Sequence, residues 1–276
     1  MKRRLIDALA PYPRLFYPLA RRFGPARFRD YLVDNETEIV ISGYPRSANS
    51  FAVTAFAESQ RRAVRIAHHV HVEAQLMEAV RRGLPAIALV RNPRDAVRSL
   101  KAALPSTNLR YALRRWIRFY TRVEQLSDHI VISDFSCTTG DFASVIRQVN
   151  RKFGTQYLPF ENNEANLTHV FSRMKLRQFE LGTLQFGAAP GEQRRAELDS
   201  MDLVLDPALL AEANRLYGRL LALRSVPECS TCREQVSGLD EEGAAAPARA
   251  GATLLSTAAA AVSIGALAAL VMDMAA

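Results

Sequence analysis

The stretch from residue 38 to residue 56 constrains the fold more than any other part of the chain. It opens with the apolar β-formers Ile39, Val40 and Ile41, is interrupted by Gly-Tyr-Pro at 43–45, and continues from Ser50 as an Ala-rich helical pattern. A strand, a loop and a helix in this order direct backbone N–H groups and the positive end of the helix dipole toward one point. We therefore expect this loop to bind a phosphate or sulfate group.

The loop matches the Walker A pattern of nucleoside triphosphate-binding loops only in part. Gly43 and Ser50 stand at the expected positions, but Ala48 replaces the second glycine and Asn49 replaces the lysine. Arg46 is the only cation in the loop sequence. The pattern thus predicts a phosphorylated ligand other than a typical Mg-nucleoside triphosphate.

Two segments together resemble the donor-binding motifs of sulfotransferases that use 3′-phosphoadenosine 5′-phosphosulfate (PAPS). Residues 44–51, Tyr-Pro-Arg-Ser-Ala-Asn-Ser-Phe, are similar to the 5′-phosphosulfate loop of that family. In residues 91–99, an arginine followed eight residues later by a serine is similar to its 3′-phosphate motif. The resemblance extends over about residues 36–155, weakens toward 225 and is absent beyond. It implies a sulfotransferase that uses PAPS as co-substrate, without a metal.

The resemblance also assigns a role to each matching residue. The 5′-phosphosulfate would be held by Arg46, Ser47, Asn49 and Ser50, with Ala48 completing the loop. Phe51 would face the adenine, and the 3′-phosphate would be held by Arg91 and Ser99. Ala48 stands where the family has glycine and Arg46 where it more often has lysine, so we expect a slightly different donor geometry. Arginine remains a natural bidentate partner for sulfate-like oxygens. The alternatives are a P-loop kinase-like phosphotransferase, and a non-catalytic nucleotide- or membrane-binding protein with the same fold.

A histidine cluster follows the next predicted strand, residues 64–70. If the extended backbone continued to Glu73, the side chains of His69, His71 and Glu73 would share one face and would allow a metal site, but no other His or Cys cluster offers further ligands. The cluster has two other readings, a structural role and acid–base chemistry. Because the sulfotransferase family places a histidine base at the end of this strand, the resemblance implies His69 as the base, with His71 and Glu73 as alternatives, and Arg46 as the cation that stabilises the leaving group.

The remaining pattern predicts an α/β fold. Strands are expected at 85–90 and 129–134, with helices at 50–62, 72–82, 109–126 and 141–153, and connections this short favour a parallel sheet in a three-layer α/β/α arrangement. The resemblance implies the P-loop NTPase-like sulfotransferase version of this fold. Arg91 would lie at the carboxyl edge of the sheet, after which Asn92 is a good N-cap and Pro93 a good first helical residue.

Length and composition indicate one α/β domain with appendages. The chain has 276 residues, of which 49% are hydrophobic, and a net charge of +8 that suits a nucleic acid, a membrane surface or a polyanionic small ligand. The aromatic residues at 109–126 recur at helical spacing, which favours a core stripe over nucleic-acid binding, and we expect no nucleic-acid partner. We predict a basic N-terminal cap (1–36), a sulfotransferase domain (37–225), a polar linker (226–250) and an Ala-rich tail (251–276).

The two ends of the chain leave alternatives open. The cap either packs on the domain or contacts anionic lipid through Phe16, Tyr17, Leu19 and Phe23. Residues 251–272 carry no charge over 22 residues, which is long enough for a C-terminal membrane anchor, but small residues dominate, so a disordered or loosely helical tail is the alternative. Three Cys and no cleavable signal peptide favour a cytoplasmic body.

The region after residue 155 carries few readable signals. Helices are expected at 171–185, 191–200 and 207–223. In the sulfotransferases that the chain resembles, a basic segment in this region closes over the donor, and the resemblance implies Arg194 or Arg195 for this role. Cys229 and Cys232 indicate at most a redox role. The acceptor would present a hydroxyl or amine, on a small molecule, a glycan or a lipid. Its pocket is expected near 104–108 and 155–190.

Overall fold

The computed structural model describes residues 8–180, 196, 198, 200–201 and 203–224. Several predicted features lie outside the described residues: the linker, the candidate membrane anchor at 251–272, both cysteines of the 229–232 pair, and the arginines at 194 and 195. Most of the helix expected at 191–200 also lies outside them. Within the described residues, no helix is both long enough and apolar enough to cross a membrane.

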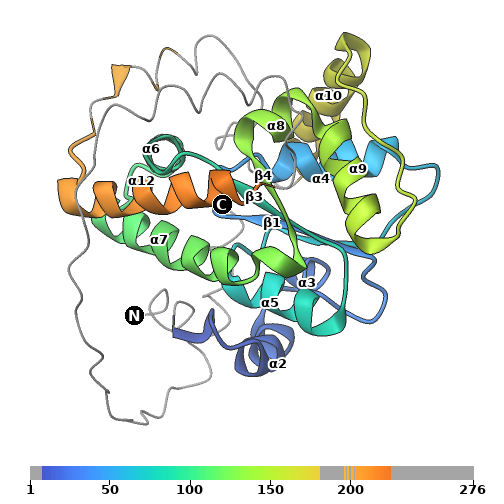
Figure 1. Cartoon of the computed structure of the whole chain (residues 1–276), viewed down its shortest axis with the longest axis horizontal. Coiled ribbons are helices and arrows are strands. Elements are labelled where there is room, and N and C mark those ends of the chain that lie inside the picture. The colour runs from blue at the N-terminus through green and yellow to red at the C-terminus, as the bar shows by residue number, and fades with distance from the viewer. Residues whose placement is uncertain (1–7, 181–195, 197, 199, 202, 225–276) are drawn as a thin grey trace.

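The centre of the fold is a parallel sheet with the strand order β2-β1-β3-β4. Its strands are β1 (Ile39–Gly43), β2 (Ile66–His68), β3 (Ala86–Val90) and β4 (Val131–Asp134). Helices lie on both faces (Figure 1), so the expected three-layer α/β/α class is confirmed. Parallel strands require crossover connections, and the helical segments between the strands supply them.

The helices fall on two faces of the sheet. The connecting and flanking helices are α4 (Asn49–Ser59), α5 (Glu73–Arg82), α6 (Pro93–Ala103), α7 (Leu109–Gln125), α8 (Phe135–Gly140), α9 (Phe142–Phe153), α10 (Glu164–Glu180) and α12 (Pro207–Ala222). In β1, Val40 faces the core under α5, α7 and α12, whereas Ile39 and Ile41 face the core under α4, α9 and α10. Alternate residues of one strand point to opposite faces, so an uninterrupted apolar strand is buried on both sides.

Several predicted boundaries shift. The strand expected at 64–70 spans only Ile66–His68, because His69 has a φ of +54° and leaves the extended conformation. The helix expected from 171 is α10, which begins earlier, at Glu164. The helices expected at 72–82, 109–126 and 207–223 agree with α5, α7 and α12 to within one residue.

The N-terminal segment packs onto the sheet domain. Its helices α2 (Pro13–Phe23) and α3 (Ala26–Arg29) bury Phe16, Tyr17 and Phe28 in the same core as Val40. Phe16 and Tyr17 are 4% and 6% exposed, so the expectation that they contact lipid is wrong. The reason is tertiary: α2 packs against α5, and these two rings lie on its inward face.

Candidate functional site

The loop predicted to bind phosphate connects β1 to α4 at the carboxyl edge of the sheet. Its first residue, Gly43, pairs with Leu89 of β3, and a Cβ atom at Gly43 would lie 2.4 Å from the Leu89 carbonyl oxygen. Glycine is therefore needed here so that β1 and β3 can approach closely. This contact places the end of β1 beside the end of β3, where Arg91 follows.

The backbone of this loop is strained. Arg46 and Ala48 have φ values of +69° and +65°, in the left-handed region that L-residues other than glycine rarely adopt. Ala48 is also the N-cap of α4 and provides no side-chain hydrogen bond to the first turn. By contrast, the side chain of Asn92 caps α6 by accepting hydrogen bonds from Arg94 N and Asp95 N. Strain that persists at a loop before an uncapped helix is typical of a ligand site.

The structure brings the two sequence motifs into contact. The Arg46 Nε donates a hydrogen bond to the Ser99 Oγ at 3.0 Å, and the Arg91 Nη1 donates one to the Arg46 carbonyl oxygen at 3.0 Å. The Arg91 guanidinium also lies 4.1 Å from the centre of the Phe135 ring. Burial lowers the pKa of Arg91 from its usual value, with Asp95 acting in the opposite direction, but an arginine keeps its charge in proteins. Two cations are thus held together at the edge of the sheet.

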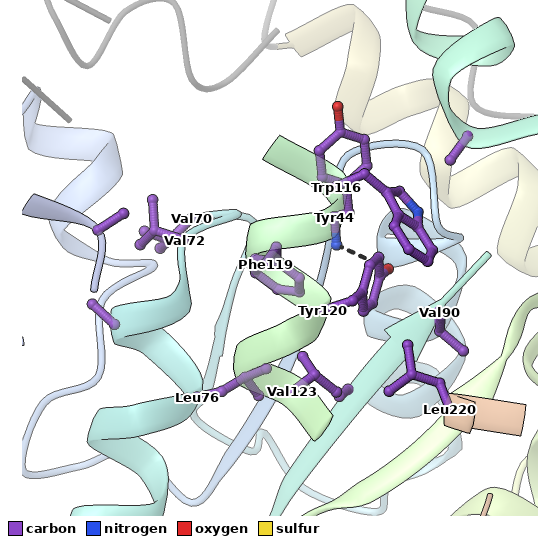
Figure 2. Packing of buried hydrophobic residues seen from close by; sticks show 14 of the residues in the cluster. Tyr44, Val70, Val72, Leu76, Val90, Trp116, Phe119, Tyr120, Val123 and Leu220 are labelled. Carbon is purple, nitrogen blue, oxygen red and sulfur yellow. Dashed lines mark hydrogen bonds between the residues drawn. The ribbon is translucent and has the colours of Figure 1, made fainter. Parts of the chain in front are cut away.

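Tyr120 of α7 supports the loop, and sequence reasoning missed it. Its hydroxyl donates to the Leu89 carbonyl oxygen at 2.6 Å. The same hydroxyl accepts from the Tyr44 backbone N at 3.3 Å, the bond drawn as a dashed line in Figure 2. Because that hydroxyl has one proton, the Ser47 Oγ, 3.1 Å away, must donate to it. The sequence signal was the aromatic stripe of α7, which predicts burial correctly but not a hydrogen bond to the loop.

The predicted donor-binding residues of the loop differ in accessibility. Arg46, Ala48 and Ser50 are half-buried, whereas Ser47 and Asn49 are buried. The Ser47 hydroxyl proton is used by Tyr120, and the Asn49 Nδ2 donates to the Tyr44 carbonyl oxygen at 3.0 Å. These two residues could therefore bind a ligand through their backbone N–H groups, while their side chains hold the loop in shape.

Phe51 lies in the core. Its ring is 4% exposed, with centroids 6.1 Å from Phe160, 6.4 Å from Phe142 and 5.9 Å from Phe171. The contact of Phe51 with an adenine stays a prediction. Such a contact requires the surrounding aromatic side chains to leave part of the Phe51 ring accessible.

The histidine cluster lies beside the loop. The Ser50 Oγ is 3.0 Å from the His69 Nε2, the His69 Nδ1 is 2.7 Å from the His68 Nδ1, and the His71 Nδ1 is 2.7 Å from the Gly43 carbonyl oxygen. His69 and His71 each have a φ of +54°. The two rings approach to 5.7 Å through these left-handed turns and not through the strand alternation that the sequence suggested.

The hydrogen bonds distinguish His71 from His69. A carbonyl oxygen can only accept, so the His71 Nδ1 carries the proton and the Nε2 of neutral His71 carries a lone pair. The His71 Nε2 has no hydrogen-bond partner in the part of the chain that the structure describes. Both ring nitrogens of His69 are engaged, one with His68 and one with Ser50. His71 is therefore the histidine with a nitrogen ready to accept a proton.

All three histidines are neutral at physiological pH. Burial is the largest cause, and it lowers the pKa of His68 to about 3 and that of His71 to about 4, while the pKa of His69 falls well below its usual value. Cationic neighbours act in the same direction, among them Arg177 on His68 and Arg115 on His71. A neutral imidazole is the form that can act as a base.

Glu73, the third candidate base, is engaged elsewhere. It is 3% exposed, and its Oε1 accepts from the Arg118 Nε at 2.7 Å, whereas its Oε2 is buried without a partner. Among the described residues, no group of three or more His, Cys, Asp or Glu is arranged to hold a metal ion.

Tyr31 and Arg115 border the histidine cluster, and the sequence pattern did not reveal either. The Tyr31 ring lies 4.4 Å from the His68 ring, and the Arg115 Nη2 donates to the His71 carbonyl oxygen at 3.1 Å. Arg177, near the end of α10, lies 5.9 Å from the centre of the Tyr31 ring. The N-terminal segment, α7 and α10 thus meet at the histidines, which no local signal in the sequence could indicate.

Comparisons with known proteins give little further guidance. No family model matches this chain, and the search of the curated proteins found no match. The crystal structure of the mouse sulfotransferase SULT7A1 complexed with PAP is similar over 76% of this chain and 91% of that chain, with 14% sequence identity and a TM-score of 0.40. A likeness at this level carries no argument about activity, so the functional proposal rests on the residues themselves.

Proposed function

We propose that this protein is a PAPS-dependent sulfotransferase that moves a sulfuryl group from PAPS to a hydroxyl or amine of an acceptor. The observation that carries the proposal is the pair of hydrogen bonds by which Arg91 and Ser99 contact Arg46. The two motifs that resemble the 5′-phosphosulfate and 3′-phosphate sites are far apart in sequence, and a single donor could use both only if they met in space.

The geometry of the loop fits an anionic donor. Residues 46 and 48 have left-handed backbone conformations, and the first turn of α4 has no side-chain cap. Several backbone N–H groups can therefore bind an anion at the positive end of the helix dipole. Arg46 and Ser50 would hold the 5′-phosphosulfate, with backbone N–H groups of Ser47, Ala48 and Asn49. Arg91 and Ser99 would hold the 3′-phosphate, because a guanidinium has five N–H donors and only one of those of Arg91 is used by the Arg46 carbonyl.

The proposed transfer is a direct displacement at sulfur. A bond forms between the acceptor oxygen or nitrogen and sulfur while the bond from sulfur to the bridging phosphate oxygen breaks, and the acceptor proton passes to a base. Arg46 supplies positive charge where that bridging oxygen becomes anionic. The sequence implied His69 as the base; the open Nε2 of His71 favours His71, with His69 positioning Ser50.

The kinase-like alternative has no support from the loop. Its lysine position is occupied by Asn49, which is 4% exposed and donates to the Tyr44 carbonyl oxygen. No charged side chain at this position can therefore contact a γ-phosphate, which the Walker A lysine does.

The test uses purified full-length protein with sulfur-labelled PAPS and with γ-phosphate-labelled ATP, each in the presence of a panel of hydroxyl and amine acceptors. The proposal predicts label transfer from PAPS with release of 3′,5′-adenosine diphosphate, and no transfer from ATP. Arg46→Ala should abolish the transfer, and Arg62→Ala, in a surface ion pair with Glu38, is the matched control. Binding of PAPS without turnover would favour a non-catalytic nucleotide-binding protein, and transfer from ATP alone would favour a kinase.

A further inference from the structure

The outward face of α2 combines exposed apolar and cationic side chains. Leu15, Pro18 and Arg22 follow each other at spacings of three and four residues, which places them on one side of the helix, opposite the buried Phe16 and Ala20. Leu15 is 56% exposed, and Tyr12, at the N-cap of the helix, is 58% exposed. Large apolar side chains are thus exposed at the beginning of this helix.

The arginines on this segment have no acidic partner within the described residues. Residues 8–29 contain five arginines and no aspartate, glutamate or lysine. The side chains of Arg14, Arg22 and Arg29 are exposed, and none of them forms an ion pair within the described residues. Other arginines of the protein are paired, as Arg65 is with Asp34 and Arg82 with Glu78. The positive charge of α2 and α3 is therefore available to an external anion.

The segment is firmly attached to the domain. The Ala74 backbone N donates to the Ala10 carbonyl oxygen at 2.8 Å, and the Tyr31 carbonyl oxygen accepts from the Gln75 Nε2 at 2.8 Å and from the His68 backbone N at 3.1 Å. These bonds lie before α2 and after α3 and connect both ends to α5 and β2. The exposed face is thus held in one orientation, and α2 lies at the periphery of the molecule (Figure 1).

We propose that the outward face of α2 docks on an anionic lipid surface. Tyr12 and Leu15 would enter the boundary between head groups and acyl chains, while Arg14 and Arg22 would contact lipid phosphates. Aromatic and aliphatic side chains beside cations without acidic residues are the combination that binds such surfaces. A second copy of the chain is a poor occupant, because a two-fold contact would bring these arginines together without a carboxylate between them. This inference does not depend on the donor site or on sulfuryl transfer.

A local probe in the full-length protein tests the docking. Leu15→Trp places an indole at the proposed contact, and Val204→Trp is the matched control at another apolar position, 86% exposed, just before α12. With vesicles of phosphatidylcholine and phosphatidylglycerol, we expect a blue shift of the emission and quenching by brominated lipid for Leu15→Trp only, after the signal of Trp116 is subtracted. Vesicles of phosphatidylcholine alone should give neither. Because the measurement is local, lipid binding elsewhere in the chain does not produce it.

Charge reversal provides the second test. The double variant Arg14→Glu/Arg22→Glu should lower the affinity for the anionic vesicles by at least about tenfold, since each cation near such a surface contributes to binding. Arg114→Glu, at an exposed position of α7, should change it much less. The proposal is overturned if the indole at position 15 is not quenched, if Val204→Trp is quenched equally, or if neutral vesicles bind as well. Recruitment of an acidic protein or dimerisation in place of vesicle binding would also overturn it.

Discussion

The loops after β1 and β2 differ from the turn after β3, although all three lie at the carboxyl ends of strands. The first two contain Arg46, Ala48, His69 and His71, which are all the non-glycine residues with positive φ in the described chain. The turn after β3 contains none, and its Asn92 and Pro93 are standard residues for a helix start. Under the proposed function, strain is concentrated where backbone groups and reacting side chains would face the donor and acceptor, whereas the third turn only has to present Arg91.

The largest effect should come from the histidine of the second loop. His71→Ala should lower kcat by about 10²–10⁴-fold, because that range is typical for loss of a general base, and should leave PAPS affinity nearly unchanged. His69→Ala should lower kcat less and weaken donor binding through Ser50. The rates of PAPS turnover and the calorimetric affinities of both variants test this, with His129→Ala at an exposed position as control. If His69→Ala loses turnover and His71→Ala keeps it, the assignment of the base is wrong.

The residues after β3 should determine how strongly the protein prefers PAPS over a donor without the 3′-phosphate. If Arg91 and Ser99 hold the 3′-phosphate, adenosine 5′-phosphosulfate should bind more weakly than PAPS by roughly 1.5–3 kcal/mol for each charge-assisted hydrogen bond that is lost. Arg91→Ala should remove most of this difference, and Arg94→Ala, at an exposed position in the first turn of α6, should preserve it. Equal calorimetric affinities of the wild type for the two donors would contradict the assignment of the 3′-phosphate site.

The histidine loop should also make the fold sensitive to acid. His71 has its pKa lowered from 6.5 to about 4 in the folded protein, so between these pH values the unfolded chain binds a proton that the folded protein does not. Stability should therefore be fully present above pH 6.5 and should fall as the pH decreases toward 4, by up to about 1.4 kcal/mol per pH unit for each such histidine. Urea unfolding across this range measures the slope. His71→Gln should reduce it, His129→Gln should not, and a flat profile would refute the burial argument.

The smallest effect concerns strain in the first loop. Ala48→Gly should stabilise the protein by about 1 kcal/mol, because the left-handed conformation costs an L-residue roughly 1–2 kcal/mol and the greater freedom of glycine in the unfolded chain offsets part of this. Ala57→Gly, at an exposed position of α4, should instead destabilise by about 1 kcal/mol. Thermal unfolding distinguishes the two signs. A loss of stability in Ala48→Gly would mean that the loop is not strained at this residue.

Local sequence signals sufficed for the fold and for the secondary structure around the two predicted donor motifs. The apolar strands, the Asn92-Pro93 helix start and the strand–loop–helix pattern around Gly43 depend on neighbouring residues, and the structure has each of them. The sequence did not reveal the inward orientation of Phe16 and Tyr17, since α2 could have presented those rings outward if α5 did not cover them. It also missed the hydroxyl of Tyr120, which contacts the loop from 73 residues away in sequence.

The sequence by itself determined which residues stand at the strand ends, because a strand and its following loop are set by local patterning. Only the tertiary structure decided how those residues meet. Arg91 reaches Arg46 because β1 and β3 are neighbours in the sheet, and the proton of His71 is placed by the carbonyl of Gly43, 28 residues earlier. Such contacts depend on strand order and on the side of the sheet each helix covers, and these are settled by long-range packing, which no local pattern encodes.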